Sequence, residues 1–370
     1  MPYIKNKLPD YPLTSDMWDK IAADGRPIAV YGMGNGADKL FERLEKYGKR
    51  PDAVFASDGF VRGHSFRGYK VMSLSEVIAA FGDFIILLSF ASGRAEVIEM
   101  IRELDGRFDM FVPDMPVTGD EYFDKEFYNE NYEQILKAYA ALSDEDSKSA
   151  FASIINYKLS GKLKYLFDCY SDTSDMYSLL REDIETAVDA GAYNGDTVRE
   201  LIGYRPGVKK IYAIEPDSRN YKKLCKYVNE GDDACLIEPI NAAAYSANLS
   251  GQFSGSGNRN SSISSTASHE NRAENVALIR IDSISDKRID YIKYDVEGAE
   301  LDALEGSCGV IEKNHPDLLV SIYHRSEDIF KIVNYTSQKY PFYSLFIRRT
   351  LCFPAWEIAL IAVTDKQIIK

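Results

Sequence analysis

The chain has 370 residues, of which 45% are hydrophobic and 27% are charged, and a formal net charge of −13 at pH 7. A chain of this length usually folds as two compact domains, and its composition excludes disorder over any large part. The negative charge, without a basic stripe, argues against a nucleic acid as partner. The longest strongly apolar run, at 84–91, is far shorter than the ~20 residues that cross a bilayer. We therefore expect a cytoplasmic protein without membrane insertion.

Cysteine and histidine are too scattered to suggest a structural metal site. The five cysteines are odd in number and never closely spaced, and the four histidines form no pair at metal-binding spacing. This pattern is typical of a reduced protein. The sequence predicts no metal bound by these two residue types.

Residues 1–112 are expected to form a small Rossmann-like α/β domain. Short apolar runs at 28–31, 53–57, 84–89 and 108–112 are typical of strands buried on both faces of a parallel sheet. Helices are expected between them. One of these places Ala37, Leu40 and Phe41 on a single face, and another begins at a capping box made by Ser73 and Glu76. The domain should contain about four parallel strands.

Residues 113–184 read as a helical connector. Two segments, 120–142 and 143–159, have helical periodicity with an acidic outer face. We expect a solvated pair of helices that also packs against both domains and takes no part in chemistry.

Residues 185–370 alternate strand and helix again. Strands are expected at 186–190, 210–214, 235–240, 291–295 and 318–323. Two more, within 342–349 and 357–363, should form an antiparallel pair at a sheet edge, joined by a loop with Pro354 and Trp356. The segment 248–269 breaks this rhythm, since 14 of its 22 residues are Ser, Gly or Asn. We interpret it as a long loop that serves as a functional lid, with a disordered segment as the alternative.

The first of two glycine-rich turns lies in IAVYGMGNGADKL, 28–40. Gly32, Gly34 and Gly36 follow an apolar strand, and Asp58 follows the next strand, where a ribose-binding carboxylate would lie. This pattern allows an alternative function, an NAD(P)-dependent sugar-nucleotide oxidoreductase or epimerase. However, four strands are about half of what a dinucleotide usually needs. We therefore predict an accessory nucleotide pocket here and not the catalytic centre.

The second turn, VDAGAYNGDT at 188–197, differs by an early carboxylate. Asp189 ends the strand ahead of Gly191 and Gly195, and a carboxylate there would repel a pyrophosphate. It suits a cationic ligand such as S-adenosylmethionine, which carries an ammonium and a sulfonium. Glu215 ends the next strand, where its carboxylate can accept hydrogen bonds from both ribose hydroxyls.

Five motifs in order, VDAGAYNGDT, IEPD, NAAAYS, DYIKYDVEGAE and SIYHRSED, resemble the FkbM family of S-adenosylmethionine-dependent methyltransferases. The resemblance covers about 165–363 and implies a seven-stranded Rossmann-like methyltransferase sheet over 185–370. It also implies methyl transfer to a hydroxyl of a sugar, a glycan precursor or a natural product. The implied donor-binding residues are Asp189, Gly191, Ala192, Tyr193, Gly195, Asp196 and Thr197 at the methionine end, Glu215 at the ribose, and Asn241 and Ala242 at the adenine.

On the acceptor side, His324 is the leading general base, because an unperturbed histidine pKa near 6.5 suits proton abstraction at neutral pH. Asp295 and Glu297 are alternative bases, or they orient His324 or hold sugar hydroxyls. A divalent cation bound by these carboxylates is a further alternative. Lys293, Glu300 and Tyr323 are candidates for substrate binding, although an ordinary ion pair also explains the first two.

Two questions stay open from the sequence. The chain could be a binding protein that keeps the methyltransferase fold without its activity, and nothing in the sequence identifies the acceptor. Whether the chain forms a homo-oligomer is equally open.

Overall fold

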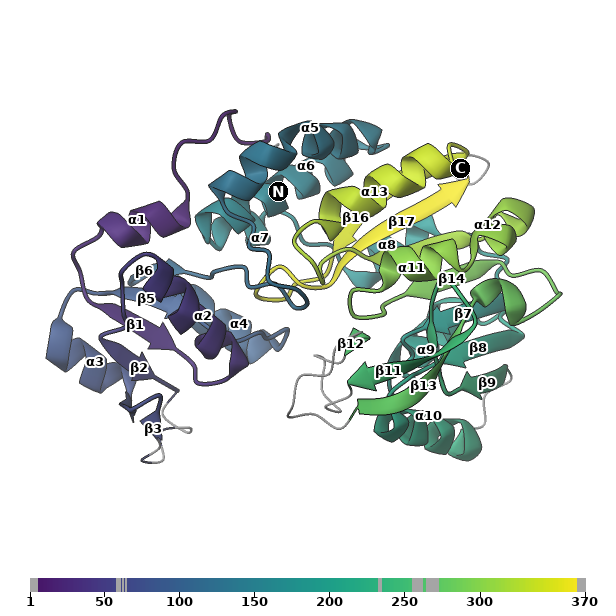
Figure 1. Ribbon diagram of the computed structural model, residues 1–370, viewed down its shortest axis with the longest axis horizontal. Helices are drawn as coiled ribbons and strands as arrows, with labels where there is room; N and C mark the ends of the chain where they lie inside the picture. Colours follow the sequence, from purple (N-terminus) through teal and green to yellow (C-terminus); the bar gives the residue numbers. More distant parts are fainter. Residues whose placement is uncertain are drawn as a thin grey trace.

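The computed structural model describes residues 6–57, 61, 63, 65–231, 235–254, 262–263 and 273–364. Two α/β units, each with its own sheet, lie at opposite ends of the molecule, and a group of helices joins them across the top of the view (Figure 1). The mixed α/β fold with two mainly parallel sheets agrees with the sequence-based prediction. The boundaries 1–112, 113–184 and 185–370 stay a prediction.

The N-terminal sheet has six strands in the order β3-β4-β2-β1-β5-β6 within the described residues. All neighbours pair in parallel except β3 and β4. The strands are β1 (Ile28–Tyr31), β2 (Ala53–Phe55), β3 (Ser65–Phe66), β4 (Tyr69–Met72), β5 (Ile85–Leu88) and β6 (Asp109–Phe111). The helices are α1 (Met17–Ala23), α2 (Asn35–Lys46), α3 (Leu74–Phe81) and α4 (Ala95–Asp105).

The expectation of about four strands in this unit is corrected to six. The four expected strands are present, and β3 and β4 are additional. Of β4 only Val71 is buried, so the hydrophobic pattern of this segment is too weak to reveal a strand. The capping box of Ser73 and Glu76 begins α3 as expected.

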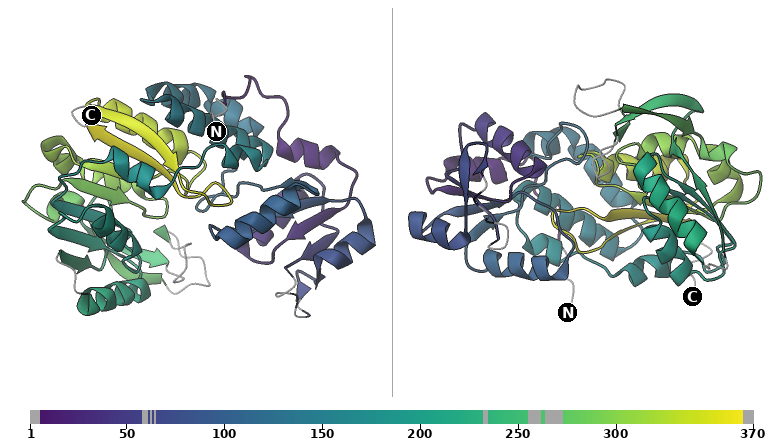
Figure 2. Two further views of the ribbon diagram at one scale, coloured as in Figure 1. Left: turned by 180° about the vertical axis from the view of Figure 1, so that it is seen from behind. Right: turned by 90° about the horizontal axis from the view of Figure 1, so that it is seen from below.

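The helical group between the sheets belongs mainly to the C-terminal unit. It comprises α5 (Lys125–Ala141), α6 (Glu145–Ser160), α7 (Lys164–Phe167) and α8 (Thr173–Leu179). Helix α5 packs on α13 (Asp328–Lys339), and α6 packs on β16 (Tyr343–Arg349). Views from behind and below show this group over the sheet that carries β16 (Figure 2). Helix α6 is more buried than a solvated connector would be, because most of its side chains lie in the core.

The C-terminal sheet has the expected seven strands, in the order β16-β17-β15-β14-β7-β8-β9. β17 pairs antiparallel with both of its neighbours, β15 and β16, and all other pairs in this sheet are parallel. The remaining strands are β7 (Thr186–Ala190), β8 (Lys210–Ile214), β9 (Leu236–Ile240), β14 (Tyr291–Tyr294), β15 (Asp317–Ser321) and β17 (Ile358–Thr364). The remaining helices are α9 (Asp196–Tyr204), α10 (Ser218–Glu230), α11 (Glu300–Glu305), α12 (Cys308–Asn314) and the short 3-10 helix η2 (Ile281–Ser283).

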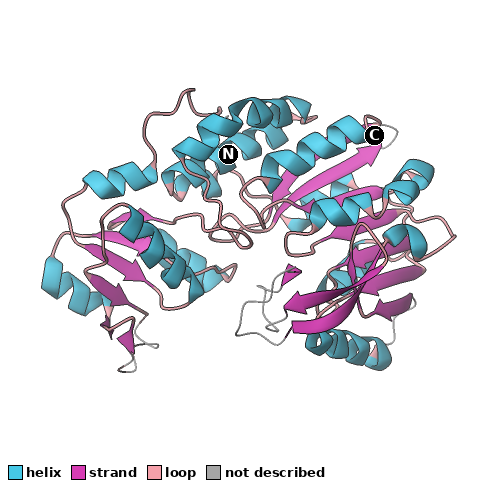
Figure 3. Cartoon of the chain, viewed as in Figure 1, coloured by secondary structure: helices cyan, strands magenta, loops and turns pink. Residues whose placement is uncertain are grey.

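A separate four-stranded sheet, absent from the sequence-based prediction, is present among the described residues (Figure 3). Its strands are β10 (Ala242–Ala244), β11 (Leu249–Ser254), β12 (Ser262–Ile263) and β13 (Ala273–Ile279). The expected lid at 248–269 is therefore partly a strand pairing with β13, while residues 255–261 and 264–272 lie outside the described residues. The sequence did not predict β11, because its serines and its glycine are typical of a loop. Gly251 fits because a side chain there would press on Leu278.

Candidate functional site

A pocket of about 170 Å³ opens at the carboxyl ends of β7, β8 and β14. The chain continues from β7 to β8 on one side of the sheet and later returns to β14 on the other, so β7 and β14 flank a topological switch point, where α/β sheets bind ligands. Its wall consists of Gly191, Tyr193, Asp196, Thr197, Ile214, Glu215, Pro216, Asp217, Asn220, Ala243, Ala244, Asp295, Val296, Glu297, Tyr323 and Glu357. We call this the carboxylate pocket, because six of these described lining residues are acidic and none is Lys or Arg.

The β7–α9 turn lies against the end of β14 because of a glycine. Gly191 has φ +88°, and a Cβ built on it would lie 1.9 Å from the backbone oxygen of Asp295. Neither this φ nor this approach suits a side chain. Helix α9 then begins after Gly195, and its Thr197 hydroxyl donates to the Asp189 carboxylate over 2.5 Å.

Behind the pocket wall, Lys293 lies between two carboxylates. Its Nζ is 3.5 Å from Asp189 Oδ1 and 3.4 Å from Asp295 Oδ2. Burial opposes the charge of Lys293, but the two carboxylates raise its pKa, while burial raises the pKa of Asp189. Neither Lys293 nor Asp189 lines the pocket. The ammonium of Lys293 therefore holds the ends of β7 and β14 together from behind.

Glu215, at the end of β8, faces the pocket with a buried carboxylate. Its two oxygens accept hydrogen bonds from the backbone amides of Tyr193 and Asp217, both at 2.8 Å. Burial raises the pKa of Glu215 to about 7 against these two hydrogen bonds, which lower it. The side chain is fixed, and its remaining lone pairs can accept hydrogen bonds from a ligand.

His324 lies at the far side of the pocket among three carboxylates. Its Nδ1 is 2.8 Å from Glu300 Oε1, and its Nε2 is 3.5 Å from both Asp295 Oδ1 and Glu297 Oε2. Burial lowers the pKa of His324, but the carboxylates outweigh it and raise the pKa to about 10. The expectation of an unperturbed pKa near 6.5 is therefore corrected: this imidazole is protonated at neutral pH, which does not suit a general base.

The ligand atoms of Asp295, Glu300 and His324 lie within 4.8 Å of one another, close enough to hold one cation. Ion pairing explains the same arrangement, because Glu300 Oε1 already accepts from His324 and from the backbone amides of Val296 and Gly298. Glu300 thus fixes the turn after β14. Like Lys293 and His324, it lies outside the pocket wall.

Three residues of the pocket wall have strained backbone. Tyr193, Glu297 and Glu357 have φ values of +47°, +54° and +59°. Left-handed backbone in a non-glycine residue costs on the order of 1 kcal/mol and persists where its surroundings enforce it, often at functional sites. All three point to this pocket as a functional site.

The expected donor-binding residues divide into two groups. Gly191, Tyr193, Asp196, Thr197 and Glu215 line the pocket. The remaining five, Asp189, Ala192, Gly195, Asn241 and Ala242, lie behind or beside its wall. Beside Asn241, whose side chain donates to the backbone oxygen of Glu215, the wall is instead formed by Ala243 and Ala244.

On the acceptor side, Asp295, Glu297 and Tyr323 line the pocket. Sequence reasoning missed two neighbours from distant segments. Glu357 comes from the β16–β17 loop, and Thr118, from the connector, donates its hydroxyl to the Glu297 backbone oxygen over 3.2 Å. No motif marks either residue; each could be found only from the fold.

No helix in the described ranges is long and apolar enough to cross a membrane. In the N-terminal unit, Gly32, Gly34 and Gly36 line a second pocket, treated below, whereas Asp58 lies outside the described residues.

Comparisons with known proteins relate the part of the chain that forms most of the carboxylate pocket to a family of methyltransferases. Residues 189–352 match the model of a protein family described as the methyltransferase FkbM domain. The structure is similar to that of a methyltransferase FkbM from Methylobacillus flagellatus KT, with 20% identity over 97% of this chain and 94% of that one and a TM-score of 0.66. An rRNA methylase from Streptococcus thermophilus matches 51% of this chain and 92% of its own, with 13% identity and a TM-score of 0.35. No curated protein matches the sequence.

Proposed function

We propose that the chain, whose residues 189–352 match the model of the FkbM methyltransferase domain, is an S-adenosylmethionine-dependent O-methyltransferase. The acceptor is a hydroxyl of a sugar, a glycan precursor or a natural product. The acidic wall of the carboxylate pocket carries this proposal. Six carboxylates without a lysine or arginine among the described lining residues suit a ligand with an ammonium and a sulfonium group.

The residues of the wall fit this donor. Gly191 brings the bare backbone of the turn to the pocket wall against the end of β14, and Glu215 presents a fixed carboxylate for the ribose hydroxyls. Ala243 and Ala244 offer a flat apolar surface for the adenine. When bound, S-adenosylmethionine supplies an electrophilic methyl group on its sulfonium.

Asp295 is the proton acceptor in this mechanism. Burial opposes its charge, but Lys293 and His324 outweigh burial and lower its pKa, so the carboxylate is ionised at neutral pH. A weak base is sufficient, because a hydroxyl that has gained a methyl group and still holds its proton is a strong acid. Asp295 would accept the proton that the acceptor oxygen loses on methylation.

His324 is then a positioning residue. Its buried imidazolium faces Asp295 and Glu297 and lowers the pKa of Asp295. Thr118 holds the backbone next to Glu297 from the other side. The acceptor would therefore meet a rigid pair of carboxylates, which suits recognition of neighbouring sugar hydroxyls.

The test is donor binding and methyl transfer by the full chain, with labelled S-adenosylmethionine and a panel of sugars and nucleotide sugars. Glu215→Ala should weaken donor binding by about 100-fold, since two hydrogen bonds to a charged group are lost. Glu238→Ala, on the exposed side of β9, is the matched control and should bind normally. Glu215→Gln, which keeps one acceptor oxygen, should be intermediate.

Asp295→Asn should keep donor binding and lower turnover by 10²–10⁴-fold, the usual contribution of a positioned base. Asp286→Asn, an exposed carboxylate outside the pocket, serves as its control. Unchanged donor affinity in Glu215→Ala would contradict the ribose assignment. Donor binding without transfer to any hydroxyl would favour a non-catalytic binding protein instead.

A further inference from the structure

A second and larger cavity, of about 570 Å³, lies at the carboxyl ends of the N-terminal strands. It opens where β1 and β5 are neighbours although the chain visits β2, β3 and β4 between them. This is again a topological switch point, where α/β sheets bind ligands. The volume is in the range of small-molecule sites. We call it the N-terminal cavity.

Its charge is opposite to that of the carboxylate pocket. The charged lining residues among the described ones are Lys39 and Arg94, and none is acidic. These two cations favour an anion, and Arg94 also pairs with Glu96 outside the wall. Lys39 already contacts the backbone oxygen of Pro116 over 2.6 Å, and burial lowers its pKa.

The backbone adds further positive potential. Helices α2 and α4 both begin at this cavity, and neither has a side chain hydrogen-bonded at its N-cap, which is Gly34 in one and Arg94 in the other. Free amides at a helix start bind phosphate oxygens well. Helices α2 and α4 follow the neighbouring strands β1 and β5, so their two N-termini are suited to hold the two phosphates of a diphosphate.

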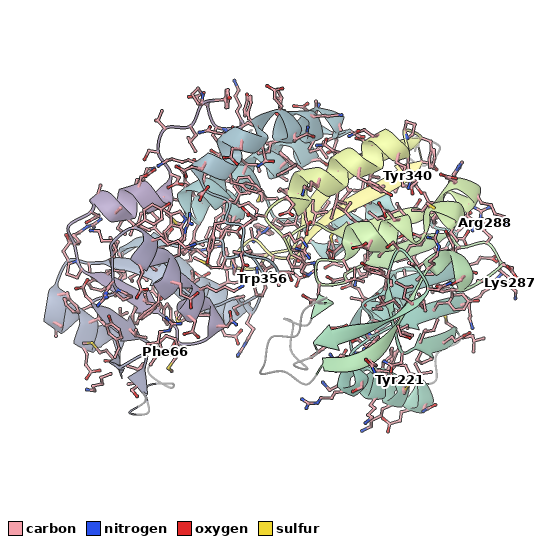
Figure 4. All side chains as sticks on the ribbon, viewed as in Figure 1. Phe66, Tyr221, Lys287, Arg288, Tyr340 and Trp356 are labelled. Carbon is pink, nitrogen blue, oxygen red and sulfur yellow. The ribbon has the colours of Figure 1, made fainter. Side chains whose placement is uncertain are left out.

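The remaining wall is apolar and aromatic. Tyr31, Met33, Phe90, Met100 and Trp356 line the cavity. Trp356 comes from the β16–β17 loop of the other unit, and Figure 4 labels it between the two halves of the molecule. Its indole Nε1 is buried and lacks a hydrogen-bond partner, so it can donate to a ligand. A flat base with polar edges matches these surroundings.

We propose that the N-terminal cavity binds a nucleoside diphosphate, either free or as the leaving part of a nucleotide sugar. The diphosphate lies at the starts of α2 and α4 beside Lys39 and Arg94, and the base lies among the aromatic side chains. This site is independent of the proposed methyl transfer.

The cavity is also physically joined to the carboxylate pocket. The segment that contributes Pro116 and Val117 to the cavity continues into Thr118, which contacts Glu297. The loop that contributes Trp356 continues into Glu357 of the carboxylate pocket. A ligand in the N-terminal cavity would therefore contact two segments that also form the acceptor side of the carboxylate pocket.

The test is calorimetric titration of the full chain with ADP, UDP, pyrophosphate, adenosine and UDP-glucose. Saturable binding of ADP or UDP, much tighter than adenosine or pyrophosphate alone, is expected. Lys39→Gln/Arg94→Gln should weaken it at least tenfold. The control Lys46→Gln/Arg102→Gln removes two charges from the same helices outside the cavity and should change it less than twofold.

Two further variants separate this site from the carboxylate pocket. Glu215→Ala, which alters the donor site only, should leave ADP binding unchanged. Trp356→Phe should weaken binding and remove the ligand-induced change in tryptophan fluorescence, since the other tryptophan, Trp18, is a buried residue of α1 that does not line the cavity. Absence of binding at millimolar ADP and UDP, or equal loss in both double variants, would overturn the proposal.

Discussion

The β1–α2 turn and the β7–α9 turn have the same architecture and open onto pockets of opposite charge. In each, a glycine lets the turn touch the end of the neighbouring strand: Gly36 approaches Ser89, and Gly191 approaches Asp295. The first pocket has two basic residues and no acidic one among its described lining residues, and the second has six acidic residues and no lysine or arginine. The glycines therefore determine the packing of both turns, and the surrounding charges determine which ligand each pocket suits.

Substitution of the glycines tests the shared part of this comparison and should have the largest effect on stability. Gly191→Ala places a Cβ 1.9 Å from a backbone oxygen at a φ of +88°, and should lower the free energy of unfolding by about 3 kcal/mol or more. Gly36→Ala, with a 2.1 Å approach to the Ser89 oxygen, should cost nearly as much.

Gly34→Ala is the matched control in the first turn, because its Cβ would meet nothing within 4 Å. It should cost about 1 kcal/mol or less, the loss of a favourable N-cap residue. Urea unfolding measures all three variants. Equal stability of the three would show that close packing does not explain these glycines.

The acidic surroundings of His324 give the second prediction. Its folded pKa of about 10 exceeds the ordinary value near 6.5, so the folded state holds a proton that the unfolded state loses. The stabilisation is fully present below about pH 6.5 and is lost as the pH rises through 10.

Urea unfolding of wild type and His324→Gln between pH 6 and 10 measures this contribution. The variant should be destabilised at pH 6, because the buried Glu300 and the partly buried Asp295 and Glu297 lose their cation, and the difference from wild type should shrink as the pH rises. Arg325→Gln, the neighbouring cation, controls for loss of a positive charge. A difference that stays constant with pH would contradict the ion-pair interpretation.

The strands and both glycine turns could be predicted from the sequence, because buried parallel strands are continuous apolar runs. β11 could not, since its serines and glycine resemble a loop. Within the site, the position of Asp189 before the glycines led us to expect that its carboxylate binds the methionine end of the donor. In the structure this carboxylate contacts Lys293 and Thr197.

The opposite charges of the two pockets could also be recognised only from the fold. Arg94 and Lys39 lie 55 residues apart, and Glu357 reaches the carboxylate pocket from the last strand pair. The expected pKa of His324 was wrong for the same reason. Its three carboxylate neighbours come from the turn after another strand, and their distances to the imidazole depend on how β14 and β15 pair.

The smallest predicted effect concerns Glu215 and the charge of the carboxylate pocket itself. Burial raises the pKa of this carboxyl to about 7, whereas its ionised form is the better acceptor for ribose hydroxyls. The ionised fraction rises about tenfold between pH 6 and pH 8, and donor affinity should rise by the same factor. Binding should also release a proton at pH 6, which calorimetry detects in buffers of different ionisation enthalpy. In Glu215→Gln both effects should disappear, while any titration of the donor itself remains. If the donor affinity of the wild type changes with pH in the same way as that of Glu215→Gln, Glu215 does not bind the ribose.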